Sequence, residues 1–201
     1  TSTTGSVSFG AGSSVLAGSL KGTAPATGAL VGTDVQQAGA VQVVAGGAGG
    51  ITFGNNVRLV ANGADLSLTS SKSGADLSLG AGTALEAHGG NLVVNSAGRA
   101  IMQPVGTAGN LLTRTLNGYS GGALTVTGST GVTLGNASTT VGNTMTLTSS
   151  NGLVTVGAGV TNVGGVTNLN GNMGVVLLDN ATINSAGNFN VNVSSAKGGL
   201  T

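Results

Sequence analysis

The chain contains no cysteine, two prolines and very few aromatic residues, which make up 2% of its 201 positions. Without cysteine it can form neither a disulfide nor a thiolate metal site. Charged residues are also rare, at 5%, whereas an ordinary globular domain carries about a quarter. Because 39% of the residues are hydrophobic, the chain lacks the low hydrophobicity and high charge that are typical of disorder.

Six basic and five acidic residues give a net charge of +1, which is too small to attract nucleic acid or anionic lipid. The longest aliphatic run is Val175–Leu178, whereas a helix needs about 20 apolar residues to cross a bilayer. We therefore expect no nucleic-acid partner and no membrane-spanning segment. The sequence shows neither a signal peptide nor an initiating methionine, so we expect a processed protein or a piece of a longer one.

Glycine is abundant, with 39 residues, and a repeated tetrad runs through the whole chain. The tetrad is an apolar residue, Ser or Thr, a second apolar residue and Gly, as in Val132–Gly135 and Val154–Gly157. Including degraded copies, the tetrads end at Gly10, Gly32, Gly54, Gly80, Gly106, Gly135, Gly157 and Asp179. These positions are 22 residues apart towards both ends and 26 to 29 apart in the middle. A recurring period of this length is typical of a solenoid.

Within each repeat the side chains alternate with a period of two. Leu124 and Val126 alternate with Thr125 and Thr127, which indicates strands with one buried face. Pairs of Gly and Asn separate the strands and suit tight corners with positive φ, at 89–91, 121–122, 142–143, 164–165 and 187–188. A repeat of about 22 residues accommodates three strands and three corners. The sequence therefore predicts an all-β fold, a parallel right-handed three-sided β-solenoid of about eight coils that spans residues 1–201 as one segment.

The repeat predicts an inward stack of side chains, and the coils that depart from it predict loops. We expect the residues just before the tetrad ends to form one inward stack: Phe9, Phe53, Leu79, Leu134 and Val156. The coils at about 54–122 are longer than the others, so their extra residues predict loops. One loop holds Arg114 and the only tyrosine, Tyr119, which are candidate binding contacts because loops on a regular scaffold often carry binding residues. A second irregular piece covers residues 19–28.

Charged side chains gather in the middle of the chain: Arg58, Asp65, Lys72, Asp76, Glu86 and His88. We expect Arg58 and Glu86 to form a surface ion pair and His88 to be exposed at a corner. Asp65 and Asp76 precede two different strands. This scatter does not provide the clustered carboxylates that a glycan-cleaving β-helix needs, and no acidic residue lies in a calcium-binding GGxGxD repeat. The sequence therefore predicts no catalytic residue, metal site or cofactor.

The outward positions of one strand in each repeat carry Thr and Asn in pairs. Ranks of Thr-x-Thr resemble the flat face of ice-binding β-solenoids, but they are more typical of side chains that hydrogen-bond along a stack of strands. The first interpretation predicts a face for ice or flat sugars, and the second a stabilising ladder. The positions are Ser67/Thr69, Val93/Asn95, Thr125/Thr127, Thr146/Thr148, Asn168/Asn170 and Asn190/Asn192.

The coils written GALTVTGSTGVTLGNASTTVGNTMTLTSSNGLVTVG, from Gly122 to Gly157, resemble the β-helical shaft repeats of filamentous-haemagglutinin-type bacterial adhesins. These are giant exoproteins exported by two-partner or autotransporter routes. The resemblance implies a secreted or cell-surface location and a role as a structural shaft or filament segment. The Asn-Pro-Asn-Gly motif of the two-partner secretion domain is absent, so the chain corresponds to shaft.

Two other function classes stay open at this point. The first is a binding module for carbohydrate, ice or another cell, and the second, more distant, is a polysaccharide-degrading enzyme. Neither end of the chain shows a capping helix or a charged, proline-guarded edge strand. We therefore expect further coils of the same protein, or axial self-association, as partners, together with glycans on host or neighbouring cells.

Overall fold

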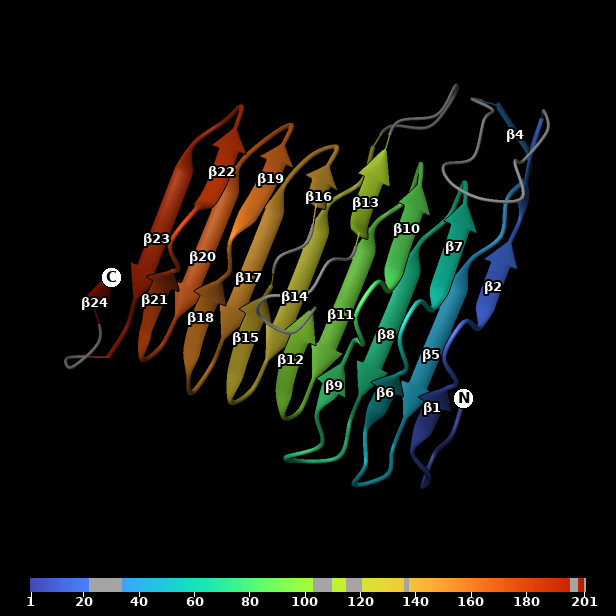
Figure 1. Ribbon diagram of the computed structural model, residues 1–201, viewed down its shortest axis with the longest axis horizontal. Coiled ribbons are helices and arrows are strands. Elements are labelled where there is room, and N and C mark those ends of the chain that lie inside the picture. Colours follow the sequence, from blue (N-terminus) through green and yellow to red (C-terminus); the bar gives the residue numbers. More distant parts are fainter. Residues whose placement is uncertain (22–33, 103–109, 115–120, 136–137, 196–198, 201) are drawn as a thin grey trace.

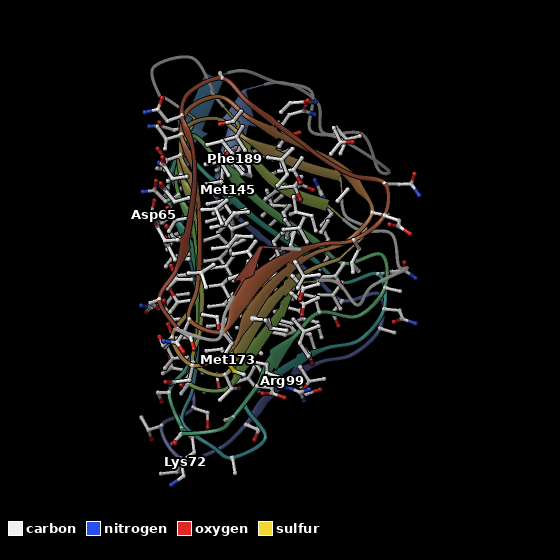
Figure 2. The ribbon with its side chains drawn as sticks, turned by 90° about the vertical axis from the view of Figure 1, so that its left-hand side faces the viewer. Asp65, Lys72, Arg99, Met145, Met173 and Phe189 are labelled. Atoms are coloured by element: carbon white, nitrogen blue, oxygen red, sulfur yellow. The ribbon has the colours of Figure 1, made fainter. Side chains whose placement is uncertain are left out.

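The computed structural model describes residues 1–21, 34–102, 110–114, 121–135, 138–195 and 199–200. All regular elements in these residues are β-strands, and three parallel sheets stack the coils side by side along a rod (Figure 1). In each coil the chain passes from sheet 1 to sheet 2 and then to sheet 3, and the path is right-handed (Figures 1 and 2). The view along the rod shows a three-sided section with side chains filling its interior (Figure 2). The predicted fold class is confirmed.

Each sheet collects one short strand from successive coils. Sheet 1 contains β1 (Val7–Phe9), β6 (Ile51–Phe53), β9 (Leu77–Ser78), β12 (Arg99–Met102), β15 (Gly131–Leu134), β18 (Leu153–Val156), β21 (Gly174–Leu177) and β24 (Gly199–Leu200). Sheet 2 contains β2 (Ser14–Ala17), β7 (Arg58–Asn62), β10 (Ala84–His88), β13 (Asn110–Arg114), β16 (Ser138–Val141), β19 (Gly159–Val163) and β22 (Ala181–Ser185). Sheet 3 contains β5 (Val41–Ala45), β8 (Leu66–Ser70), β11 (Leu92–Ser96), β14 (Leu124–Gly128), β17 (Met145–Ser149), β20 (Thr167–Gly171) and β23 (Phe189–Val193).

The number of coils is lower than predicted: seven in the described residues, with β24 beginning an eighth. β1 pairs directly with β6, in the register Val7↔Ile51, so no coil ending at Gly32 lies between them. Instead, β3 (Ser19–Lys21) and β4 (Asp34–Gln37) form an antiparallel hairpin that leaves the first coil, and Gly32 itself lies outside the described residues. The sequence period was misleading because the first coil, including its hairpin insertion, is 44 residues long, which is the length of two ordinary coils.

Two other tetrads are displaced from their predicted positions. The strand that pairs with Val132–Leu134 is β12, so the predicted tetrad at 103–106 was wrong and its residues lie outside the described ones. Ile101 occupies the outward position at which most other tetrads carry Ser or Thr, and this hid the strand in the sequence. Near the C-terminal end Leu177 pairs with Val156, so Leu178 rather than Asp179 follows the strand.

The predicted inward stack is confirmed. The rings of Phe9 and Phe53 lie parallel with centroids 4.7 Å apart, and Leu79, Leu134 and Val156 are buried. Met102 fills the place between Leu79 and Leu134, so the apolar column continues from coil to coil. Apolar side chains from all three sheets meet along this line and form one continuous core.

At the predicted corners, glycine is required more by close packing of the backbone than by a positive φ. Among the predicted Gly and Asn corner positions that the structure describes, Gly89 alone has a left-handed φ, of 78°. Most of the other glycines at these corners lie against the backbone of the preceding coil, namely Gly90, Gly122, Gly142, Gly164, Gly165 and Gly187. A Cβ on Gly122 would collide with the carbonyl oxygen of Gly90, and one on Gly164 with that of Gly142. Side chains at these corners would therefore push neighbouring coils apart.

We predict that Leu134→Asp unfolds the coils around β15. Leu134 is 1% exposed, so the substitution buries an unpaired carboxylate and removes apolar contacts, at a cost of several kcal/mol. Circular dichroism on heating measures the effect. Thr133→Asp, on the outward face of the same strand, is the control and is expected to change the melting temperature by a few degrees only. Equal melting temperatures for the two variants would contradict the assigned register.

Candidate functional site

The predicted Thr and Asn positions form two straight columns on the outward face of sheet 3. Strand pairing places Thr125, Thr146, Asn168 and Asn190 in one column, and the residues two positions later in the other. The second column therefore contains Thr127, Thr148, Asn170 and Asn192. Within each column the side chains recur with the ~4.8 Å spacing of the strands.

Side-chain hydrogen bonds run along both columns. The amide nitrogen of Asn168 donates to Thr146 Oγ1 over 3.3 Å, and that of Asn190 donates to Asn168 Oδ1 over 2.8 Å. In the second column Asn170 donates to Thr148 Oγ1 over 3.2 Å, and Asn192 donates to Asn170 Oδ1 over 2.7 Å. Each amide thus bonds to the preceding coil, which is the hydrogen-bonding pattern that the ladder interpretation predicted.

The outward face of sheet 3 extends further towards the N-terminal end than predicted. Gln42 and Val44 on β5 pair with Ser67 and Thr69, so they head the two columns at the N-terminal end. The alternation in Val41–Ala45 was a signal that could have revealed them, because its apolar and polar positions match those of the later strands. All outward residues of the sheet 3 strands are uncharged, and Val44 and Val93 interrupt the polar ranks.

A second ladder lies on sheet 2. Thr140, Asn162 and Asn184 are paired in register, and Asn184 donates to Asn162 Oδ1 over 2.9 Å. These side chains line a shallow hollow of about 700 Å³, together with Val141, Val163 and Ile183. The hollow contains no charged residue, so it offers no group for acid–base chemistry.

The two candidate loop contacts are not brought together in the described structure. Arg114 ends β13, where its backbone pairs with His88. The side chain of Arg114 and the whole of Tyr119 lie outside the described residues. Their role in binding stays a prediction.

The charged residues form contacts that differ from those expected. The Arg58–Glu86 pair is present, with Nε and Nη2 of Arg58 donating to the two carboxylate oxygens over 2.9 and 3.0 Å, but Glu86 is buried rather than on the surface. The prediction of an exposed His88 was wrong, because its side chain is fully buried. His88 Nε2 lies 3.0 Å from Glu86 Oε2, without the alignment of a hydrogen bond. On its other side Nδ1 lies 3.0 Å from Asn62 Oδ1.

The surroundings of Glu86 favour its ionised form. Burial alone would raise the pKa of this carboxyl. The contacts with His88 and Arg58 outweigh burial and hold the pKa below its usual value. The folded protein therefore contains a buried carboxylate whose partners belong to two neighbouring coils.

The two aspartates have partners in the next coil. Asp76 accepts hydrogen bonds from the backbone and guanidinium of Arg99, and although partial burial raises the pKa of Asp76, these bonds lower it overall. Asp65 accepts two hydrogen bonds from Asn91, whose own side-chain oxygen accepts one from the Ala123 amide. These charges therefore tie successive corners together rather than meeting at one place.

In the described part of the chain no three His, Asp or Glu side chains gather in a way that would hold a metal ion. Nor do these residues contain a helix long and apolar enough to cross a membrane. Comparison with protein-family models, curated proteins and solved structures found no match to this chain.

We predict that Asn170→Ala lowers the free energy of unfolding by about 1–2 kcal/mol, because Asn170 makes one side-chain bond to Thr148 and accepts one from Asn192. Chemical denaturation measures the change. Asn151→Ala, at an exposed corner, is the matched control and is expected to stay within about 0.5 kcal/mol of the parent. A ladder without energetic value would give the two variants the same stability.

Proposed function

We propose that the chain is a structural shaft segment, a rod that holds other parts of a protein apart. The observation that carries this proposal is the continuity of contacts along the rod. Backbone pairing, the apolar core and the Asn ladders all run from coil to coil. Each added coil lengthens such a rod by about 4.8 Å without changing its section.

The resemblance of residues 122–157 to adhesin shaft repeats supports a finer form of the proposal. In that form the chain belongs to a secreted or cell-surface bacterial adhesin of the filamentous-haemagglutinin type. The absence of cysteine and the uncharged outward face of sheet 3 are compatible with an exported rod whose stability comes from ladder hydrogen bonds. The catalytic alternative is less well supported, because Glu86 and Asp76 are both held by arginines.

A binding module is the second candidate, and the regular, uncharged face of sheet 3 favours it. Two parallel columns of hydroxyl and amide groups present a repeating surface to a repeating ligand, such as a flat polysaccharide or ice. However, the amides of Asn168, Asn170, Asn190 and Asn192 already donate along the ladder. Because these amide N–H groups are already used within the rod, the structural shaft is favoured over the binding module.

Deleting one whole coil tests the proposal. Removal of residues 145–166 joins Thr144 to Thr167 and takes out β17, β18 and β19, which leaves β14, β15 and β16 to pair with β20, β21 and β22 in the native register. We predict a folded rod that is shorter by about 4.8 Å in small-angle X-ray scattering. Neither the parent nor the shortened rod is expected to bind to a glycan array, to insoluble polysaccharide or to ice.

The control deletion removes half a coil, residues 145–155. It joins Thr144 to Val156 and takes out β17 and all of β18 except its last residue, so β19 would follow β16 directly. Because both belong to sheet 2, a strand of sheet 2 would have to take the place of a strand of sheet 3, and we expect the variant to unfold. Binding of the parent to polysaccharide or ice, lost in a Thr127→Tyr variant, would contradict the shaft and establish the binding module.

The two ends of the described rod expose parts of its core. At the N-terminal end a hollow of about 360 Å³ opens between Val7, Phe9, Val15 and Val43. At the other end Phe189 is 44% exposed, although its side chain points into the section (Figure 2). A further coil with the same section would cover these groups, whether it belongs to the same protein or to a second copy.

We predict that the chain associates end to end as its concentration rises, and that Phe189→Lys weakens this association at least tenfold. The substitution places a charge in the apolar face that a further coil would cover. Sedimentation equilibrium measures the effect. Asn190→Lys, the next residue on the outward face, is the control. A parent that stays monomeric at every concentration would rule out axial self-association and leave further coils of the same protein as the partner.

A further inference from the structure

The hairpin of β3 and β4 leaves the first coil at Gly18 and returns at Gly39. At its base the backbone of Gly39 donates to Asn62 O over 2.9 Å, and the side chain of Asn62 donates to Gly18 O over 3.4 Å. Gly18 has a φ of 75°, and a Cβ on either glycine would collide with the backbone of the other side of the hairpin base. One residue of the next coil, Asn62, therefore holds both strands of the hairpin where they leave the rod.

Asn62 is held in turn by buried charged groups. Its side-chain oxygen faces His88 Nδ1 at 3.0 Å, which leaves its amide nitrogen for Gly18 O. His88 contacts Glu86, and Glu86 receives both hydrogen bonds from Arg58. We call these four residues, Arg58, Glu86, His88 and Asn62, the buried relay. Its members come from only two strands, β7 and β10, and all except Arg58 are buried.

Both ring nitrogens of His88 face oxygen atoms, Asn62 Oδ1 and Glu86 Oε2. An ionised Glu86 can only accept hydrogen bonds, so it suits the two N–H groups of Arg58 and the ring nitrogen of His88 that face it. If Glu86 becomes protonated, its contacts with Arg58 and His88 weaken in a buried place, and the orientation of Asn62 loses its support. The loss would reach the hairpin base through the hydrogen bond to Gly18.

We propose that the buried relay is an acid-sensitive clamp on the base of the β3–β4 hairpin, which loosens this base while the coils stay folded. The inference does not depend on the shaft proposal, since it concerns the hairpin alone. Among the described side chains, the charged groups near His88 are Glu86 on its own strand and Arg58 on β7. Arg114 ends β13, the other strand that pairs with β10, and its side chain lies outside the described residues. The hairpin strands themselves carry Lys21 and Asp34.

The direction of the pH effect follows from the carboxylate. The pKa of Glu86 in the folded protein lies below its usual value of 4.5. Its stabilising contribution is therefore complete above that value and is lost as the pH falls through the folded pKa. The clamp is thus closed near neutral pH and opens in acid.

Amide hydrogen exchange followed by mass spectrometry tests the proposal on the whole chain. Protection factors, corrected for intrinsic exchange, are compared between about pH 6.5 and about pH 3.5. We expect protection of the segments around 14–21 and 34–41 to fall about tenfold in acid, relative to the coils at 145–171. In Glu86→Gln we expect low protection at both pH values and no acid step.

Two further variants separate the relay from general effects of acid. Asn62→Ala cuts the relay from the hairpin and is expected to remove the acid step even if Glu86→Gln fails to fold. Asp76→Asn breaks the exposed pair with Arg99 and is expected to leave the acid step unchanged. An acid step that persists in Glu86→Gln or in Asn62→Ala, or a loss of protection that is uniform over all coils, would overturn the proposal.

Discussion

The in-register stacking of one coil on the next is the constraint on which the rest of the structure depends. Because each strand pairs in parallel with its equivalent in the next coil, every side chain has the equivalent residue as its nearest neighbour, about 4.8 Å away. A column of like charges would repel itself at that distance, and a column of side chains at the corners would collide. The low charge and the many glycines follow from this constraint, as the contacts of Gly122 with Gly90 illustrate.

Much of the fold could be predicted because this constraint imposes the same sequence pattern on every coil. Alternation with a period of two identified the strands, and the apolar residue just before the last position of each tetrad identified the inward stack from Phe9 to Val156. The failures came where a coil departs from the pattern. A hairpin insertion gave the first coil twice the usual length, so Gly32 was mistaken for a coil of its own. In β12 the outward residue is Ile101, so its tetrad was missed.

The candidate sites were predictable to different degrees for a similar reason. The Thr and Asn columns were correctly assigned because they obey the repeat. His88 was misplaced because a glycine corner beside it suggested exposure, whereas its surroundings come from another coil. A signal was available: Asn62 precedes His88 by 26 residues, which is the length of that coil, so the two had to be neighbours. The hydrogen bond from Asn62 to Gly18 was not predictable, because it depends on where the hairpin leaves the rod.

The Asn ladder also has a direction, and this bears on what stacks on the rod. In both columns the amide nitrogens of Asn190 and Asn192 donate towards the N-terminal coils, so their oxygen atoms face the other way. An acceptor in that position is best satisfied by a side chain that donates, as an amide does and as valine does not. The ladder can therefore extend through further coils that carry Asn at both positions. In the other direction it ends on hydroxyl groups, at Thr146 and Thr148, where Asn168 and Asn170 donate. The polar face thus distinguishes the two ends of the rod, whereas the apolar core, which is similar throughout, does not.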